Sequence, residues 1–586
     1  MVLLGWQIVA MEREGARAVS AATPGEARRT LPAPVPRPRS APPDAPWPAQ
    51  APSQAAPGGI PASRAEQSGG PGPALKADVL VVGYGPVGAV LAALLGERGV
   101  SVLVVDPATE PYPLPRAAGL EARVLRLLLR LPGMAGLLDD VLPSTGATYL
   151  GPDRRPLLTA RQGQSGEFGV PVGAFVYQPS VEQALRAGIA TMPSVRVRLG
   201  AAVRGLRQDA DGVSVDLDDG GAVAARWVIG CDGTTSTVRS LLGVGYDGTT
   251  FAKRWLVVDV RSTRPLPVPS DLAFVLDPER PAVTMPVPGG HRWEWMLLPG
   301  EETEEMSRPQ SAARLLASWI DPDTVTIDRQ AVYTFHARMA HRWRVGRVLL
   351  AGDAAHTMPP FTGQGLNAGI RDAAALAWRL TEVLAGLAAG ASLDDYERER
   401  RPEVAATTSR AVRAGRLIQA TSPTQVALTR TALRTLAHLP GRTSLPGSGA
   451  AWHRLQAVAR PRRESGRWAG TVLPNPAVRT ADGTRGRLED LLGPSWALLG
   501  LGVDPAHGLP PAVRAWARGR GATLLTVTHP GAAGEIRSTC NVVEDLDGTL
   551  LRISHRRGEH RLVVIRPDRQ LLGAFPTPLP AGVLPG

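Results

Sequence analysis

Three closely spaced glycines, Gly83, Gly85 and Gly88, offer the clearest chemistry in the sequence. A glycine in the first place permits a tight turn, one in the second lets the backbone approach a pyrophosphate, and one in the third lets a helix pack on a strand. The free N–H groups at the start of that helix would face the anion. Asp106, at the end of the next apolar run, can hydrogen-bond the ribose hydroxyls. These four residues predict a dinucleotide site.

The segments around the glycines have the patterns needed to position them. The run DVLVVG at residues 78 to 83 predicts a buried strand, and residues 84 to 99 carry apolar side chains at helical spacing. The run VSVLVVD at residues 100 to 106 predicts a second strand. Strand, helix and strand in this order form a βαβ unit, and the pattern alone suits NAD and FAD equally.

Two later segments also end a predicted strand at an acidic turn. RWVIGCDGTTSTVRSLLG, at residues 226 to 243, places Asp232 and Gly233 after a strand, with Ser236 as the N-cap of the next helix. GRVLLAGDAAHTMPP, at residues 346 to 360, places Gly352 and Asp353 after another strand. We expect the three strand ends to meet around one ligand.

The glycine motif, the Asp-Gly turn and the Gly-Asp turn, in this order, resemble the group A flavoprotein aromatic hydroxylases, which are FAD-dependent monooxygenases. The resemblance covers residues 77 to 420 and is weaker beyond them. The phrases RWLVVDV, LDPERP, HRWEWMLLPGE, MPPFTGQGLNAGIRDAAALAWRL and YERERRPEV are most similar to the 3-(3-hydroxyphenyl)propionate hydroxylase type. The implied fold is α/β, with a Rossmann-like FAD-binding domain, an inserted antiparallel β-sheet substrate domain and a C-terminal degenerate thioredoxin-like domain.

The resemblance also implies how individual residues serve the cofactor. Asp353 would bind the ribityl chain or pyrophosphate of FAD, and the helix from about Leu366 would direct its positive N-terminus at the flavin N1/C2=O side. That helix would bury one apolar face, made of Leu366, Ile370, Ala373, Ala377, Leu380 and Leu384. The residues assigned to FAD binding are Gly83, Gly85, Gly88, Asp106, Arg116, Gln178, Asp232, Gly352, Asp353, Pro360, Gly363, Gln364, Gly365, Leu366 and Asn367.

The implied reaction is monooxygenation of a phenolic aromatic substrate. NADH or NADPH would reduce FAD, and dioxygen would form a C4a-hydroperoxyflavin that hydroxylates the ring. The catalytic residue is not identified by the resemblance. Tyr333, His336 and His356 are candidates for the base that takes the phenol proton, on chemical grounds alone, and a structural role is the alternative for each.

Residues 251 to 335 are expected to form the substrate sheet. In HRWEWMLL, alternation puts Trp293, Trp295 and Leu297 on one face, and Arg292, Glu294 and Met296 on the other. Such a sheet can roof an aromatic pocket over the flavin. The alternative for the two tryptophans is an ordinary place in the core of the sheet.

Three other functions are alternatives to hydroxylation of a simple phenol. The same chemistry would serve a polycyclic aromatic polyketide in antibiotic biosynthesis, by hydroxylation or Baeyer–Villiger insertion. A catalytically silent flavin-fold binding protein is a second alternative. A flavin-dependent halogenase needs a lysine between flavin and substrate, but the only lysines are Lys76 and Lys253, and neither has suitable surroundings.

The composition of the chain argues against several other classes of function. The two cysteines, Cys231 and Cys540, cannot form a disulfide framework or a thiolate metal site, so no metal is expected. Much of the formal net charge of +12 arises in residues 398 to 470, which hold 14 arginines and 3 acidic residues. That stretch lacks interleaved aromatic residues, so a solvated surface is favoured over nucleic-acid binding.

The rest of the chain gives organisation rather than chemistry. Residues 1 to 76 predict a disordered Pro/Ala-rich leader, 77 to 420 the FAD-binding domain, 421 to 470 a basic helical linker, and 471 to 586 the thioredoxin-like domain. The opening apolar run of ten residues is too short for a membrane span. The expected setting is cytoplasmic, with a small aromatic substrate and dioxygen as partners, no nucleic acid, no membrane, and scope for a homodimer.

Overall fold

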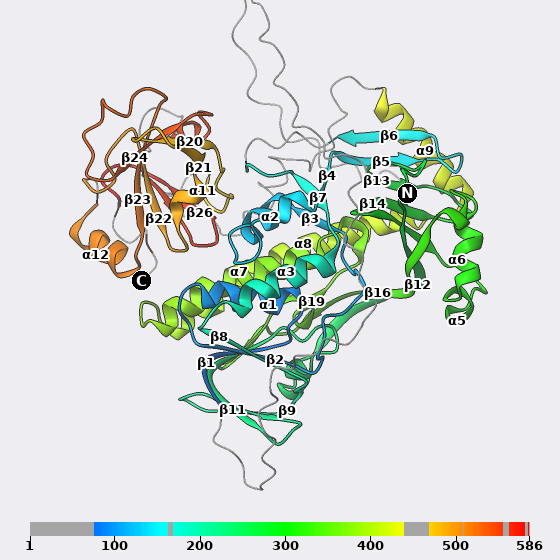
Figure 1. The fold of residues 1–586 in the computed structure, drawn as a ribbon, viewed down its shortest axis with the longest axis horizontal. Helices are drawn as coiled ribbons and strands as arrows, with labels where there is room; N and C mark the ends of the chain where they lie inside the picture. Colours follow the sequence, from blue (N-terminus) through cyan, green and yellow to red (C-terminus); the bar gives the residue numbers. More distant parts are fainter. Residues whose placement is uncertain are drawn as a thin grey trace, which may run out of the picture. The chain divides into compact units, whose positions relative to one another are not determined.

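A computed structural model describes residues 75–161, 168–438, 468–507, 509–554, 562–580 and 584 of the 586-residue chain (Figure 1). The predicted leader therefore lies outside the described residues, except for its last two, which open the first strand. The described part of the basic linker is helical, and residues 439–467 also lie outside. Among the described residues, no helix is both long enough and apolar enough to cross a membrane.

The first sheet is built from the predicted βαβ unit and the two later strands. Its main path runs β17-β18-β11-β1-β2-β8, and β11, β1, β2 and β8 pair in parallel, as do β11 and β18. Helices α1 and α3 pack on it and on each other (Figure 1). The bounds are β1 Leu75–Val82, α1 Pro86–Gly96, β2 Val102–Asp106, α3 Gln178–Ala190, β8 Val195–Leu199, β9 Val203–Gln208, β10 Val213–Leu217, β11 Ala222–Gly230, α4 Thr237–Leu241, β17 Arg344–Val345 and β18 Val348–Leu350.

The register of this sheet brings the three predicted motifs to one edge. Val82, at the end of β1, lies opposite Gly230 of β11, and Gly230 lies opposite Leu350 of β18. Each of these residues comes directly before its turn. Because parallel strands share the direction of their carboxyl ends, the glycine turn, the Asp-Gly turn and the Gly-Asp turn emerge side by side.

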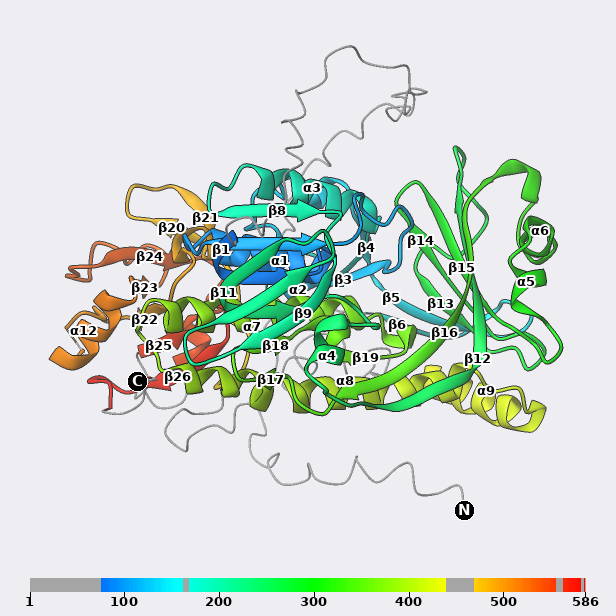
Figure 2. The same cartoon turned by 90° about the horizontal axis from the view of Figure 1, so that it is seen from below.

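The second sheet is mostly antiparallel and runs in the order β19-β16-β12-β15-β14-β13-β5-β6 (Figure 2). It includes the predicted segment 251 to 335 and takes in two earlier strands as well. Its apolar face packs under the short helices α5 and α6. The bounds are β5 Gly146–Leu150, β6 Pro156–Arg161, β12 Tyr246–Arg261, β13 Leu272–Val275, β14 Ala282–Val287, β15 Gly290–Met296, α5 Thr303–Met306, α6 Pro309–Leu316, β16 Thr326–Ala340 and β19 His356–Thr357.

Two long helices, α7 (Gly365–Leu384) and α8 (Asp394–Ile418), follow the Gly-Asp turn. The expected apolar face of α7 is buried at Ile370, Ala373, Ala377 and Leu380 and half-buried at its ends, Leu366 and Leu384. Most of the rest of the helix is buried too, including four charged residues. The reason is that α1, α8 and the C-terminal domain all contact α7. Its charged side chains are therefore paired inside the protein instead of facing water.

The smaller elements complete the fold around these layers. The strands of a three-stranded sheet, ordered β3-β7-β4, lie in the chain between β2 and α3, and α9 follows α8. The bounds are β3 Gly119–Glu121, α2 Ala122–Leu128, β4 Leu142–Ser144, β7 Gly173–Phe175 and α9 Pro423–Ala437.

The described residues between 468 and 580 form a seven-stranded sheet of their own, in the order β21-β20-β24-β23-β22-β25-β26. One of its hydrophobic clusters consists of its own residues, and a second includes Trp378 of α7. The sheet is fastened to α7 and α8 by polar contacts, such as Trp496 Nε1 donating to Glu382 at 2.6 Å and Arg566 bonding Glu399 at 2.9 Å. The bounds are β20 Ala477–Thr480, β21 Arg485–Arg487, α11 Glu489–Leu492, β22 Ala497–Leu501, α12 Pro511–Gly519, β23 Thr523–Thr528, β24 Asn541–Asp545, β25 Leu562–Ile565 and β26 Leu571–Phe575.

Candidate FAD and substrate site

A cavity of about 650 Å³ lies between the carboxyl edge of the first sheet and one face of the second. One side, called here the cofactor wall, consists of the turns at residues 83–88, 231–234 and 352–353 and the loop 360–367. The opposite side, the substrate wall, is the cavity-facing surface of strands β13 to β16 together with the Phe361 side chain, which comes from the loop and packs against Phe335. Cavity-lining residues of the two walls include Gly85, Gly233, Asp353 and Gly363 on the first, and Phe274, Val283, Glu294 and Phe335 on the second.

The glycine turn has the geometry expected of a phosphate cradle. Gly83 has a φ of +102°, and a Cβ on it would lie 2.5 Å from the carbonyl oxygen of Cys231. A Cβ on Gly88 would lie 2.0 Å from the Gly83 oxygen, so only glycine lets α1 approach β1 this closely. A Cβ on Gly85 meets nothing within 4 Å, so space for an anion remains in front of the α1 N-terminus.

The carboxylates of Asp106 and Asp232 are already engaged by their own turns. Asp106 accepts hydrogen bonds from the amides of Tyr84 at 2.6 Å and Ala108 at 2.8 Å. Asp232 accepts from the Ser236 hydroxyl at 2.6 Å, and Ser236 caps α4 as predicted. Burial raises the pKa of Asp232 despite these bonds. Neither carboxylate is among the residues that line the cavity, although Gly233 is.

Gln178 and Arg116 lie at the cavity and are connected to each other. The Gln178 carboxamide oxygen accepts from the amides of Arg116 at 3.2 Å and Ala117 at 2.6 Å, while its nitrogen donates to Glu182 at 2.7 Å. The Arg116 guanidinium lies over the Tyr112 ring, 4.2 Å from its centre. Gln178 therefore fixes the backbone that carries Arg116.

The loop before α7 presents backbone to the cavity. Gly363 is left-handed, with φ +62°, and Pro360, Gln364, Gly365 and Leu366 line the cavity beside it. Asn367 closes the loop, since its Nδ2 donates to the Gly363 carbonyl at 2.8 Å and to the Gly119 carbonyl at 3.1 Å. The α7 N-terminus thus faces the cavity, as the sequence predicted.

Asp353 faces the cavity and is exposed to it. The protein that encloses this side raises the pKa of its carboxyl by limiting hydration, and the neighbouring His356 and Arg116 oppose the rise. Its neighbour Gly352 lines the turn without facing the cavity, and its amide donates to Asp372 at 3.1 Å. A carboxylate placed in this way can accept hydrogen bonds from ligand hydroxyls.

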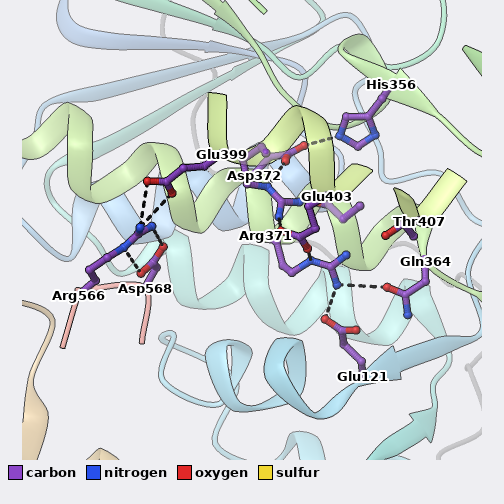
Figure 3. Close-up of polar contacts among 12 residues, drawn as sticks. Glu121, His356, Gln364, Arg371, Asp372, Glu399, Glu403, Thr407, Arg566 and Asp568 are labelled. Carbon is purple, nitrogen blue, oxygen red and sulfur yellow. Dashed lines mark hydrogen bonds and ion pairs between the residues drawn. The ribbon is translucent and has the colours of Figure 1, made fainter. Parts of the chain in front are cut away.

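A buried charge network lies behind the cofactor wall (Figure 3). Asp372 of α7 accepts from His356 Nε2 at 2.6 Å and Arg400 Nε at 2.8 Å. Burial alone would raise the pKa of Asp372, but His356 and Arg400 outweigh it and lower the pKa. Arg400 also pairs with Glu403, which pairs with Arg371 at 2.9 Å, and Arg371 donates to Gln364 at 3.2 Å (Figure 3).

This network connects the Gly-Asp turn to the loop before α7. The buried ion pairs therefore fix the positions of these two parts of the cofactor wall relative to each other. No local pattern in the sequence indicates this network. Arg371 and Asp372 are adjacent and therefore do not face each other on α7, and Arg400, the partner of Asp372, comes 28 residues later on another helix.

The substrate wall is mostly apolar, but Arg292 and Glu294 of β15 form a polar end, and Thr334 and His336 of β16 are polar as well. Phe335 and Phe361 meet edge to face with ring centres 5.6 Å apart, and Trp255 contacts Phe361 at 5.5 Å. The polar end carries Arg292 and Glu294, on the face that the alternation predicted. Trp293 and Trp295 stack on the other face, 6.2 Å apart, which confirms the interpretation that they belong to the core of the sheet.

Of the three candidate bases, only His336 is among the residues that line the cavity. Its Nδ1 lies 3.0 Å from the Thr250 hydroxyl, and burial, followed by Arg338, lowers its pKa. The Tyr333 hydroxyl bonds Arg329 instead. His356 is buried and held by Asp372.

Comparison with known proteins accounts for this arrangement. Residues 76–411 match a family model described as "FAD binding domain", and residues 470–580 match one described as "HcaD C-terminal domain". The chain belongs to the FAD-dependent aromatic hydroxylases. FAD is the cofactor of these monooxygenases, and NAD(P)H is their usual electron donor.

The relatives of this hydroxylase cover most of its length. It is 34% identical over 564 residues to the 3-(3-hydroxy-phenyl)propionate/3-hydroxycinnamic acid hydroxylase of Paraburkholderia xenovorans (strain LB400), covering 85% of this chain and 89% of the relative. Identity is 35% over 526 residues to the enzyme of that name from Mycobacterium avium (strain 104), with the same coverage. Among solved structures, anhydrotetracycline hydroxylase from Streptomyces rimosus is 28% identical, with a TM-score of 0.65 over 87% of this chain and 97% of that one.

The residues present fit FAD. The glycine turn leaves open space at a helix N-terminus, Asp353 faces the cavity with no hydrogen bond drawn by its carboxylate from the described residues, and the left-handed Gly363 brings backbone to the cavity surface. The cavity continues from this cradle to the aromatic substrate wall. A cofactor and an aromatic substrate can therefore meet inside it.

Proposed function

We propose that this monooxygenase hydroxylates a phenol of the 3-(3-hydroxyphenyl)propionate class. The observation that carries the proposal is the continuity of one cavity from the glycine cradle to a wall of phenylalanine side chains. The identity to curated hydroxylases of that substrate, over 85% of the chain, supports the same class. FAD, reduced by NAD(P)H, would supply activated oxygen for transfer to the ring.

The chain's own residues would bind and orient the two reactants. We propose that Gly83, Gly85 and Gly88 hold the pyrophosphate and that Asp353 accepts from ribityl hydroxyls. Gln178 would keep Arg116 in place beside the flavin. The amides at the α7 N-terminus, next to Gly365 and Leu366, would stabilise negative charge on the ring by about 0.3–2 kcal/mol. Asp106 keeps its proposed role at the ribose, although its carboxylate also serves its own turn.

The substrate wall would exclude water from the reacting ring. Phe335, Phe361 and Phe274 present apolar surface to the cavity, and such surface both binds an aromatic ring and keeps solvent out. The polar end of the wall would receive an oxygen substituent of the substrate.

A polycyclic aromatic substrate is a second candidate. Aklavinone-11 hydroxylase, solved with FAD and aklavinone, is 25% identical, with a TM-score of 0.67 over 86% of this chain and 96% of that one. The extended aromatic surface that runs from Phe274 to Phe361 would suit such a ring system.

We further propose that residues 471–586 form a degenerate thioredoxin-like domain. Its β22, β23 and β24 pair in parallel and its β25 and β26 pair antiparallel, which supports this fold. Cys540 is the only cysteine in it, so a dithiol reaction is not expected there.

Oxygen consumption by the FAD-loaded protein tests the function. With NADH or NADPH present, adding 3-(3-hydroxyphenyl)propionate should stimulate oxygen uptake and give a product heavier by one oxygen atom. Stimulation by a polycyclic phenol alone would favour the second candidate. FAD reduction that no phenol accelerates would overturn both.

A further inference from the structure

Glu294 supplies the carboxyl group of the substrate wall, and this group has no hydrogen-bond partner among the described residues. It lies on β15, is only 9% exposed, and that remaining exposure is toward the cavity. The nearest opposite charge is Arg292, 4.0 Å away. A buried carboxyl left in this state is costly unless a ligand engages it.

The neighbouring charges are already committed. Arg292 donates to both carboxylate oxygens of Asp259, at 2.6 and 3.0 Å, and to the carbonyls of Pro115 and Arg116 at 3.0 and 3.1 Å. Four of its five N–H groups are thus in use. Arg329 also bonds Asp259 and the Pro115 carbonyl. These contacts leave Glu294 as the group that faces the substrate.

Glu294 and the charged residues beside it form a cluster whose charges favour proton transfer from a phenol to Glu294. With both carboxylates ionised, Asp259 and Glu294 balance Arg292 and Arg329. If Glu294 takes a proton from a bound phenol, one negative charge moves from the carboxylate to the phenolate, and the total charge near the two arginines is unchanged. The proton transfer then costs little electrostatic energy, even though the dielectric constant inside the site is low.

We propose that Glu294 is the catalytic base that accepts the phenolic proton of the substrate. The phenol O–H bond breaks and an O–H bond forms on the Glu294 carboxylate, with no change of oxidation state. The ionised oxygen then directs electron density into the ring that is hydroxylated. When the ring regains its aromaticity, the proton held by Glu294 returns to that oxygen, and the hydrogen of the hydroxylated carbon leaves as a proton that neutralises the oxygen left on the oxygen donor. This assignment rests on the proposed function.

Burial supports the chemistry, because it raises the pKa of Glu294 toward that of a phenol, while Arg292 opposes the rise. The charged groups around it are Arg292 on its own strand, Asp259 on β12, and Arg329 on β16. Turnover of phenols should therefore increase with pH through this raised pKa.

His336 is the rival base and offers a matched comparison. It lines the same cavity, but its ring already bonds Thr250 and its nearest charge is the cation Arg338. The β-sheet register sets Glu294 level with Ala331 of β16, five residues from His336. That offset is roughly 17 Å along the strand, so the two side chains serve different parts of the cavity.

The test compares FAD-loaded wild type, Glu294→Gln and His336→Gln on 3-(3-hydroxyphenyl)propionate and on ring-fluorinated analogues whose phenols are increasingly acidic. We expect Glu294→Gln to lower kcat by about 10²- to 10⁴-fold on the parent phenol. The deficit should shrink as the phenol becomes acidic enough to ionise unaided. The variant should also lose the rise of kcat/KM with pH, which His336→Gln should keep.

Two controls separate this role from a structural one. Glu279→Gln, the same change at an exposed position, should match wild type. Glu294→Asp keeps a carboxylate and should keep the pH dependence even where Glu294→Gln binds FAD poorly. An equal deficit on every analogue, or a phenol-dependent deficit in His336→Gln instead, would overturn the assignment. If wild type itself oxidises no phenol, the proposed function fails and the assignment falls with it.

Discussion

The two walls of the cavity work by different means. The cofactor wall is mainly backbone, set by glycines whose missing Cβ atoms make room, as at Gly83 and Gly88. The substrate wall is mainly side chains, carried on strands that pair without a register shift from β13 to β15. Backbone geometry of this kind tolerates almost no substitution, whereas a side-chain wall can change its residues and keep its shape. We therefore expect mutations that disturb the backbone of the cofactor wall to abolish FAD binding, whereas mutations in the substrate wall should change substrate affinity by smaller amounts.

The largest effect is expected for Gly88→Ala on the cofactor wall. Its new Cβ would lie 2.0 Å from the Gly83 carbonyl oxygen, and no rotamer can relieve a clash between backbone groups. We expect the FAD-binding domain to lose stable folding and the purified protein to contain no FAD, as measured by flavin absorbance and circular dichroism.

Gly85→Ala is the matched control. Gly85 has φ −71°, which alanine accepts, and its Cβ would meet no protein atom within 4 Å. The FAD-free protein should keep its stability while FAD affinity falls, because the methyl group enters the space proposed for the pyrophosphate. If Gly88→Ala bound FAD normally, the distinction between the walls would be lost.

The next effect concerns the charges behind the cofactor wall. Asp372→Asn leaves Arg400 and His356 buried without their shared carboxylate, which should cost about 3–5 kcal/mol of unfolding free energy. Urea unfolding at neutral pH measures it. Glu304→Gln, which removes an exposed partner of Arg308, should cost less than about 0.5 kcal/mol and serves as control.

The same carboxylate predicts a pH dependence. The folded protein lowers the pKa of Asp372 below its ordinary value of 3.8. Ionised Asp372 therefore stabilises the fold above that pH, and the contribution is lost as the pH falls through the lowered value. Asp372→Asn should show a weaker loss of stability in acid than wild type. Parallel acid unfolding curves would contradict the pairing.

The turns of the cofactor wall could be predicted from the sequence because the residues that specify each turn lie close together in the chain. Gly83 has a positive φ and Gly88 packs α1 against the Gly83 carbonyl, so a motif of a few residues predicts this turn from a short stretch of sequence. The ends of β1, β11 and β18 could be aligned in advance, because parallel strands point the same way. The contact of Asp372 with Arg400 depends on how two helices pack, and no local pattern specifies it.

The substrate wall was predictable only in part, for the same reason. Alternation along β15 correctly separated Glu294 from Trp293. It did not reveal that Asp259 and two carbonyls would take four of the five N–H groups of Arg292, because these partners lie 33 and 176–177 residues away. Of the three bases that chemistry suggested, two point elsewhere, since exposure to a cavity is a property of the whole fold.

A moderate effect should appear where the two walls touch. Gly415 of α8 packs against Phe361, and an alanine Cβ there would lie 2.5 Å from the ring. Alanine favours a helix over glycine by about 1 kcal/mol, but overpacking costs about 1–3 kcal/mol, so we expect a net loss of stability. The displaced ring should also raise KM for the phenol.

A double variant tests the cause of that loss. Because Phe361→Leu removes the ring that clashes, Gly415→Ala should be less destabilising in its presence, in a thermodynamic cycle of the four proteins. Strict additivity of the two changes would show that Phe361 does not transmit the effect.

The smallest effect is expected for Cys231→Ala. This substitution changes a side chain of the cofactor wall, which consists mainly of backbone. Cys231 lines the cavity, and its amide donates to the Val82 carbonyl at 2.7 Å. Alanine keeps that bond, so FAD content should be unchanged and the loss of stability at most about 1 kcal/mol.

Burial raises the pKa of the Cys231 thiol, and only a thiolate reacts readily. Iodoacetamide should therefore modify Cys231 slowly in the native wild-type protein, as followed by peptide mass. Rapid modification, or an alanine variant unable to retain FAD, would mean that a side chain matters on this wall as much as the backbone does.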